Sequence, residues 1–291
     1  MDKTDTEFAG ALSGIAEIGP VHGPDSEHGA PSTLHLLFHV GGPKTGSTAM
    51  QSLFVDYHEQ LSANGVSYYI STDVLAERQE HRARGLDLLS SGNCNDLFDV
   101  LMGARELDES TRSDLETLLV PHFNNVESHH KYMILSSENL IQLSSEKLSF
   151  LIESAASLAG EVAGRQVEIR FVLVIRDLVS HCISFWAHDV RRFLYSEDVV
   201  CYAQSGYNLL LADAVNTFSS FPGVKTTILQ YQRAEAMAAN LLREAGASKA
   251  AALPFVARNT NKSLGAAGLE LIRRFGSRLP KGGWEVDSRA T

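Results

Sequence analysis

Short apolar runs alternate with polar stretches from residue 33 onward, and these runs have the length of β-strands. Val167–Ile175 (VEIRFVLVI) is the strongest of them. The others are Leu34–Val40, Val66–Ile70, Met133–Leu135 and Val224–Leu229. Short, near-continuous apolar runs are typical of strands that are buried on both faces of a parallel sheet. We therefore expect five strands, each separated from the next by a longer segment.

Apolar residues recur at helical spacing between the runs. The positions Met50, Leu53, Phe54, Tyr57 and Leu61 lie on one face of a helix. Similar stripes predict helices over 148–158, 179–190, 234–245 and 265–275. Residues 72–110 are polar and irregular and predict short helical pieces at best. This alternation predicts an α/β fold, an open and mainly parallel β-sheet with helices on both faces in a three-layer sandwich.

The first 32 residues differ from the rest in composition. They contain five glycines, three prolines, six acids and one lysine, which gives this segment a net charge of −5. A segment of this kind buries little apolar surface, so we expect residues 1–32 to be a disordered acidic tail. Residues 33–291 are expected to form a single α/β domain.

Net charge and cysteine content argue against several classes of protein. The 291-residue chain has a formal net charge of −10, which argues against a nucleic-acid-binding role. It has three widely spaced cysteines, an odd number that indicates neither a disulfide framework nor a four-ligand zinc site. No apolar run approaches the roughly 20 residues of a membrane span, and no targeting segment is evident at the amino terminus. We expect a cytoplasmic protein.

The strongest functional signal is the glycine-rich segment between the first strand and the first helix. It reads Gly41-Gly42-Pro43-Lys44-Thr45-Gly46-Ser47-Thr48. Glycines let backbone N–H groups approach an anion, and the following helix directs its positive end to the same point. A P-loop nucleotidase would carry lysine directly after Gly46, whereas here the lysine is Lys44. This placement favours a ligand with a shorter 5′-phosphate arm than a triphosphate, although an ordinary strand–helix turn remains an alternative.

A second candidate anion site follows the strongest strand. Arg176 and Asp177 end that strand, and Ser184 lies two turns into the next helix. Ligands bind at the carboxyl edge of parallel sheets, and an arginine fork suits a terminal phosphate. Asp177 is placed to cap the helix. The alternative interpretation of Arg176 is a surface ion pair.

These two segments resemble the cofactor motifs of sulfotransferases that use 3′-phosphoadenosine 5′-phosphosulfate (PAPS), and the bacterial carbohydrate and small-molecule enzymes look most similar. The segment 39–48 resembles the 5′-phosphosulfate loop, and a strand ending in Arg-Asp with a serine eight residues later resembles the 3′-phosphate motif. Leu178 stands where the family often has proline. The resemblance implies that Lys44 contacts the phosphosulfate and stabilises the leaving oxygen. It implies that the rest of the loop holds the 5′ phosphate, through Gly42, Thr45, Gly46, Ser47 and Thr48.

The resemblance implies further contacts and a P-loop-like fold. Arg176 and Ser184 would bind the 3′ phosphate. Arg258, in a basic loop before the last helix, is a candidate for a second contact with that phosphate, and a solvated helix-entry loop is an equal alternative. PAPS would be the sulfuryl donor, no metal would be required, and the acceptor would be a small molecule or a carbohydrate.

The base that removes the acceptor's proton is not fixed by the sequence. Glu138 follows the third strand in a Ser-Glu pair and is our first candidate, with a helix-terminal acid as the alternative. His81 is a second candidate, although a solvated surface histidine is the more ordinary interpretation. His39, on the first strand, is expected to be a core histidine bonded to the backbone.

Two other functions stay open. A P-loop-type nucleotide or small-molecule kinase would share the topology, although the chain lacks the lysine after Gly46. A catalytically inactive family member that only binds a nucleotide is the other alternative.

Overall fold

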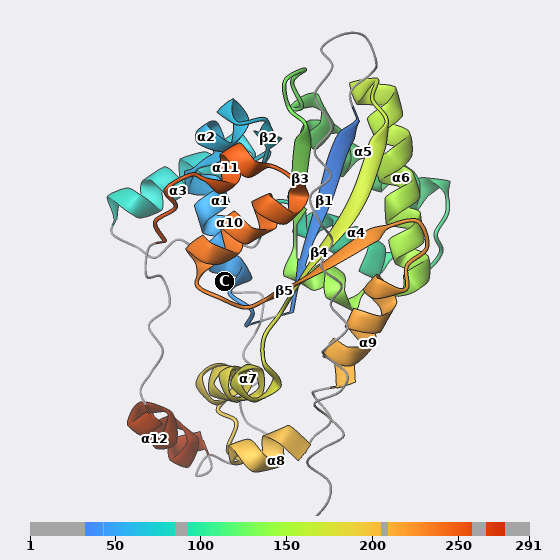
Figure 1. Ribbon diagram of the computed structural model, residues 1–291. Helices are drawn as coiled ribbons and strands as arrows, with labels where there is room; N and C mark the ends of the chain where they lie inside the picture. Colours follow the sequence, from blue (N-terminus) through green and yellow to red (C-terminus); the bar gives the residue numbers. More distant parts are fainter. Residues whose placement is uncertain (1–32, 43, 85–91, 205–208, 258–265, 277–291) are drawn as a thin grey trace, which may run out of the picture. The chain divides into compact units, whose positions relative to one another are not determined.

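A five-stranded parallel sheet forms the centre of the fold (Figure 1). The computed structural model describes residues 33–42, 44–84, 92–204, 209–257 and 266–276. The strands are β1 (Leu34–Gly41), β2 (Val66–Ser67), β3 (Tyr132–Ser136), β4 (Val167–Ile175) and β5 (Lys225–Gln230). Their order is β2-β3-β1-β4-β5, and every pairing is parallel. The predicted open parallel α/β sheet is confirmed.

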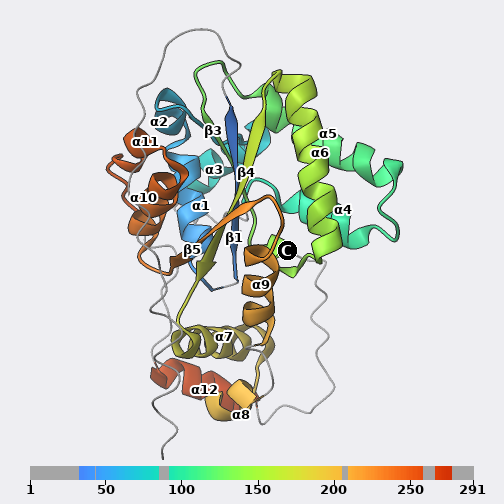
Figure 2. The same ribbon diagram turned by 45° about the vertical axis from the view of Figure 1, so that its right-hand side comes forward.

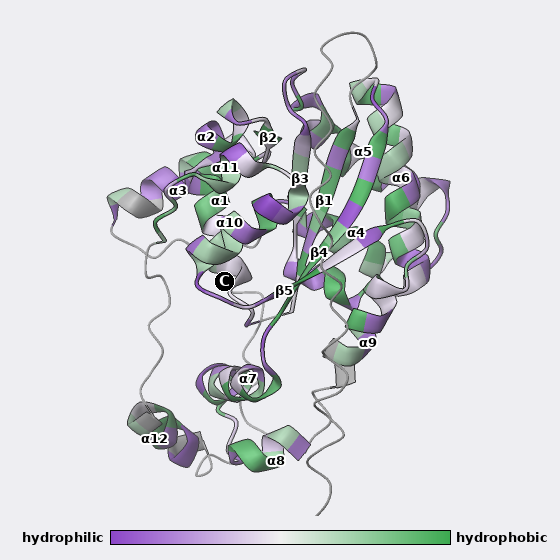
Figure 3. Cartoon of the chain, in the orientation of Figure 1, coloured by the Kyte–Doolittle hydropathy of each residue, from purple (hydrophilic) through white to green (hydrophobic). Residues whose placement is uncertain are grey.

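Side chains that alternate along each strand divide the core into two layers. In β1, Leu36 and Phe38 pack on one face of the sheet, whereas Leu37 packs on the other. β4 repeats this pattern, with Phe171 on the first face and Val172 on the second. Both faces are therefore buried, which explains why β1 is coloured hydrophobic along much of its length in Figure 3.

Helices cover both faces of the sheet (Figures 1 and 2). One face is covered by α1 (Ser47–Asp56), α2 (His58–Ala63), α10 (Ala234–Ala245) and α11 (Ser248–Ala251). The other face is covered by α4 (Asn95–Gly103), α5 (Glu109–Asn124), α6 (Ser145–Ala163) and α9 (Leu209–Ser219). The remaining helices are α3 (Thr72–Ala83), the short 3₁₀ helix η1 (Glu138–Gln142), α7 (Leu178–Phe193), α8 (Val199–Gln204) and α12 (Ala266–Gly276). This arrangement is the expected three-layer sandwich.

Three sequence predictions about elements are wrong in detail. The second strand covers Val66–Ser67 and not the predicted 66–70. The helix predicted through Tyr57 is two helices, which meet at the non-helical residue Tyr57. The Tyr57 ring packs on Phe255, and its hydroxyl donates to the carbonyl of Pro254. Residues 72–110 contain the twelve-residue α3 and the nine-residue α4. Because α3 is polar on most of its surface, its sequence has no apolar stripe that would predict a helix.

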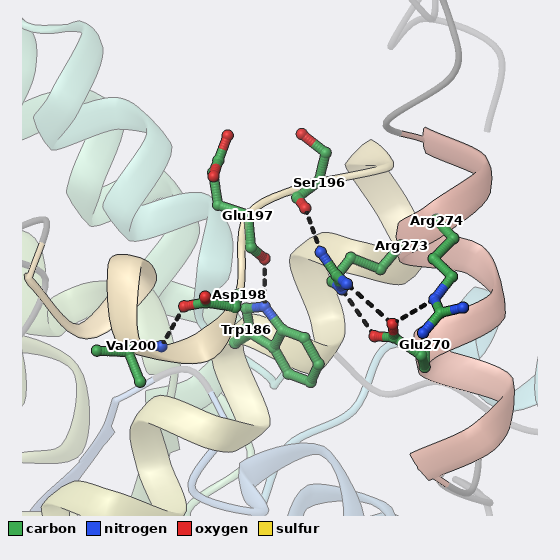
Figure 4. A network of polar contacts seen from close by, with 8 residues as sticks. All are labelled: Trp186, Ser196, Glu197, Asp198, Val200, Glu270, Arg273 and Arg274. Carbon is green, nitrogen blue, oxygen red and sulfur yellow. Dashed lines mark hydrogen bonds and ion pairs between the residues drawn. The ribbon is translucent and has the colours of Figure 1, made fainter.

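A polar network joins α7 to α8 and α12 (Figure 4). The indole N–H of Trp186 donates to the carbonyl of Glu197 at 3.0 Å. Arg273 of α12 donates to the carbonyl of Ser196 at 2.9 Å and is itself held by Glu270. Asp198 accepts from two N–H groups in the first turn of α8. The segment that follows α7 is thus held to α7 by the hydrogen bond from Trp186 to the carbonyl of Glu197.

Candidate functional site

The loop between β1 and α1 has the backbone form of an anion cradle. Lys44 (φ 67°) and Gly46 (φ 76°) are both left-handed, two residues apart. The N–H and hydroxyl of Thr45 both donate to the carbonyl of Gly42, at 3.2 and 2.5 Å. Left-handed residues in a tight turn aim successive N–H groups into one concavity, which binds anions. No side chain caps the amino terminus of α1 within the described residues, and its first turn holds no acid.

Two glycines of this loop are required by close packing. A Cβ atom on Gly41 would overlap the hydroxyl of Ser47 and lie 2.9 Å from that of Thr45. A Cβ atom on Gly46 would lie 2.7 Å from the Tyr231 ring. The Thr45 and Ser47 side chains are buried, so they form the floor of the loop, while Lys44 and Thr48 are partly exposed.

Arg176 lies against this loop. It follows the carboxyl end of β4, and its Nη1 donates to the carbonyl of Lys44 at 3.3 Å. Its guanidinium lies 4.7 Å from the centre of the Tyr231 ring. Tyr231 directly follows β5, and its N–H donates to the carbonyl of Ile175. The Nε atom of Arg176 is buried and has no hydrogen-bond partner within the described residues. Lys44 and Arg176, predicted from separate motifs, therefore meet at one edge of the sheet.

Helix α7 passes beside the same loop. Asp177 caps it as predicted, accepting from the N–H of Ser180 at 2.9 Å. One turn on, His181 Nε2 lies 3.7 Å from the position that a Cβ atom of Gly42 would take. Ser184 follows His181 by three residues, so both occupy the same side of the helix. The structure thus places Ser184 one turn beyond a residue that borders the loop.

The side chains of Lys44 and Glu138 share one electrostatic environment. Burial lowers the pKa of Lys44, and the charges of Arg191 and Arg192 lower it further, while Glu138 raises it. Burial raises the pKa of Glu138, and Lys44 opposes that shift. Glu138 opens η1 directly after β3, which ends at the same edge of the sheet as β1. A largely buried carboxylate with a raised pKa is suited to accepting a proton.

A histidine that the sequence predictions overlooked lies near Lys44. Burial lowers the pKa of His188, the bond to Asp189 raises it, and the charge of Lys44 lowers it. His188 Nδ1 lies 3.1 Å from Asp189 Oδ1, and Tyr202 donates to the other oxygen of that carboxylate at 2.7 Å. Asp189 therefore orients the imidazole, and Tyr202 orients Asp189. The combination forms a second candidate base.

A buried polar network supports the end of β3 beneath the site. The hydroxyl of Ser136 is bonded to His39 Nδ1 at 2.8 Å and accepts from Gln51 at 3.1 Å. Asn93 accepts from the N–H of Ser136 at 2.8 Å and donates to the carbonyl of Ile134 at 3.0 Å. These bonds fix the backbone two residues before Glu138. His39 is buried as predicted, but its described partner is the Ser136 hydroxyl and not the expected backbone group.

His39 makes the stability of the fold depend on pH. Burial lowers the pKa of His39 to about 3, so the folded protein holds it neutral while the unfolded chain protonates it near the ordinary value of 6.5. The unfolded state then binds more protons below that value, and we expect stability to fall by up to about 1.4 kcal/mol per pH unit between about pH 6.5 and pH 3. Urea unfolding across this range measures the slope.

The variant His39→Asn should reduce the dependence of stability on pH, whereas His129→Asn, at an exposed site, should not. Equal slopes in both variants would contradict the assignment.

Some predicted residues are not placed by the structure. Arg258 lies outside the described residues, as does the whole of the predicted acidic tail, 1–32. His81 falls in the last turns of α3, but its side chain is also outside the described part. Both site assignments stay predictions. Tyr231 was missed, although its position directly after a strand is a signal for the carboxyl edge of the sheet.

Comparisons with known proteins give no identification. No protein-family model matches the chain, and no curated protein is found to be similar to it. Within the described residues, no group of three or more histidine, cysteine, aspartate or glutamate side chains is arranged to hold a metal ion. None of the described helices combines the length and the apolar character needed to cross a membrane. Function must therefore be argued from the geometry of the loop, Arg176, α7 and Glu138.

Proposed function

We propose that this protein is a sulfotransferase that moves the sulfuryl group of PAPS to a hydroxyl or amine acceptor. The observation that carries the proposal is the contact between Arg176 and the carbonyl of Lys44, because it joins two anion-binding elements at one sheet edge. A nucleotide with a phosphate at each end of its ribose would use both. A triphosphate needs only the loop.

Each element has a defined task in the proposed reaction. The N–H groups of the loop and of the first turn of α1 would hold the 5′ phosphate. Lys44 would stabilise the charge that develops on the bridging oxygen as the sulfur–oxygen bond breaks. Arg176, with Ser184, would bind the 3′ phosphate through its planar fork. The acceptor oxygen or nitrogen then bonds to sulfur and gives its proton to a base of the protein.

Glu138 is the proposed base, and His188 is the alternative that the structure adds. Both side chains interact electrostatically with Lys44, the residue proposed to stabilise the leaving oxygen. Glu138 has a raised pKa, which makes it a stronger base than an exposed carboxylate. His188 has the orienting carboxylate of Asp189.

Replacing Glu138 with glutamine should abolish transfer while leaving nucleotide binding intact. We expect transfer to fall about 10²- to 10⁴-fold, the usual contribution of a general base. In the parent protein, transfer should decline as pH falls through the raised pKa of Glu138, because the protonated carboxyl cannot accept a proton. Rates of transfer against pH measure both effects.

Two variants serve as comparisons for Glu138→Gln. Glu146→Gln changes another first-turn acid, an exposed one on α6, and should leave the rate unchanged. His188→Asn should have an effect of less than about tenfold if Glu138 is the base. The opposite order of effects would move the role of base to His188.

A kinase is the competing function, and one observation weighs against it. Asp177 is the acid best placed by sequence to hold magnesium, but its carboxylate caps α7. Assays with sulfur-labelled PAPS and with γ-phosphate-labelled ATP, each across a panel of acceptors, separate the two. We expect label transfer from PAPS alone. Binding of PAPS without transfer to any acceptor would favour the inactive-member alternative.

We also propose a cytoplasmic location for the protein. All three cysteines (Cys94, Cys182 and Cys201) are free thiols, as expected in a reducing compartment. The acceptor would be a small molecule or a carbohydrate.

A further inference from the structure

The last turn of α7 carries two arginines. Arg191 and Arg192 are both exposed, and neither forms an ion pair with any described residue. Arg191 Nε donates to the carbonyl of Ala187 at 3.3 Å, and the Arg192 guanidinium lies 5.6 Å from the centre of the Phe193 ring. By contrast, Arg273 and Arg274 of the neighbouring α12 are both paired with Glu270.

These arginines continue the side of α7 that borders the nucleotide loop. From His181, beside Gly42, the side chains at i+4, i+7 and i+11 are Phe185, His188 and Arg192. Ring contacts link His181 to Phe185 at 5.3 Å and Phe185 to His188 at 6.3 Å, so the stripe is continuous. Arg191 stands two turns after Ser184, which is about 10 Å along the axis. Ser184, in the middle of α7, and the arginine pair in its last turn thus lie on one side of the helix, with His188 between them.

The charges of the pair act on Lys44. Burial is the main cause that lowers the pKa of Lys44, and the positive charges of Arg191 and Arg192 lower it further. Beside them, Phe193 is 65% exposed and lies 6.0 Å from the His188 ring, centre to centre. Leu194, in the left-handed conformation, ends the helix at this point. An exposed aromatic ring beside two arginines that form no ion pair with a described residue is a surface for an anionic molecule that also has an apolar face.

We propose that Arg191, Arg192 and Phe193 form an acceptor subsite, and that the acceptor is anionic. A carboxylate or sulfate group of the acceptor binds the guanidinium groups, its ring lies on Phe193, and its hydroxyl faces Glu138. The inference rests on the proposed sulfotransferase function and narrows its substrate class. It assigns the arginines to the acceptor and not to the nucleotide.

The test compares related acceptors with and without a negative charge. Three matched pairs serve as probes: trigalacturonate and its methyl ester, p-nitrophenyl glucuronide and glucoside, and 4-hydroxyphenylacetate and its methyl ester. Binding of each to the protein saturated with adenosine 3′,5′-bisphosphate is measured by calorimetry, followed by transfer from labelled PAPS. At least one acid form should bind about tenfold more tightly than its neutral partner, as one or two charge-assisted contacts would give. That preference should weaken as salt is raised.

Variants separate this subsite from the nucleotide site and from a general charge effect. Arg191→Gln and Arg192→Gln should each remove most of the preference, raise the KM of the acid acceptor and leave the bisphosphate affinity unchanged. Arg243→Gln removes an exposed arginine from the corresponding last turn of α10 and should change neither. Equal binding of both members in all three pairs, with bisphosphate bound, overturns the subsite alone. Failure of the parent protein to bind the bisphosphate overturns the sulfotransferase proposal, and the subsite falls with it.

Discussion

Replacing Lys44 with alanine is expected to reduce sulfuryl transfer about 10²- to 10³-fold, the usual effect of removing one preorganised donor from a developing negative charge. The loss follows from the role proposed for the ammonium group at the bridging oxygen, and Lys44 is the one lysine in the segment 41–48. Its half-buried position lowers its pKa and strengthens its interaction with an anion that enters the site. Rates with labelled PAPS, at saturating acceptor, measure the loss.

A second variant at the same position separates chemistry from backbone strain. Lys44 has a left-handed backbone (φ 67°), which alanine tolerates poorly and glycine tolerates well. Lys44→Gly should therefore be more stable than Lys44→Ala by about 1 kcal/mol and yet equally inactive. Lys131→Ala, at an exposed lysine before β3, should keep full activity. Recovery of transfer in the glycine variant would show that the lysine side chain has no role in the reaction.

Replacing Arg176 with alanine is expected to weaken binding of adenosine 3′,5′-bisphosphate about 100-fold, since a bidentate charged contact is lost. The same variant should bind adenosine 5′-monophosphate nearly as well as the parent does. The ratio of the two affinities, measured by calorimetry, isolates the 3′ phosphate. Arg176→Lys, which keeps the charge without the planar fork, should fall between the two.

The structural role of Arg176 requires a control. Because Nη1 also supports the loop through the carbonyl of Lys44, alanine could loosen the 5′ site as well. In that case both nucleotides would lose affinity equally, and a direct 3′-phosphate contact would be refuted. Arg170→Ala changes an arginine within β4, one paired with Glu168, and should leave both affinities unchanged.

The strands of the sheet could be predicted because each one is a short apolar run that is visible in the sequence. The run 171–175 in β4 is apolar on both faces, which is typical of a strand that is covered on both sides of a parallel sheet. Polar α3 and α5 carried weaker signals. In α5, Leu115, Leu119 and Phe123 recur every four residues, but the helix also contains Pro121, a residue that disfavours helix interiors. The contacts of Tyr57 with Pro254 and Phe255 join residues that are far apart in the sequence.

The candidate site residues that the sequence predicted lie in recognisable motifs after strands. The residues that it missed come close to these motifs only in the folded chain. Lys44, Arg176 and Glu138 each follow a strand of the parallel sheet, so the carboxyl-edge rule brought them together. Tyr231 obeys the same rule after β5. His188 and Arg191 become candidate site residues because α7 runs beside the loop. The sequence patterns did not predict this position of α7.

Thermal unfolding with two nucleotides tests the central claim most directly. Adenosine 3′,5′-bisphosphate at 100 times its Kd should stabilise the protein by about 2.7 kcal/mol and raise its Tm by several degrees, and magnesium ATP at the same concentration should not. Stabilisation by magnesium ATP without any by the bisphosphate would contradict a nucleotide held between Lys44 and Arg176.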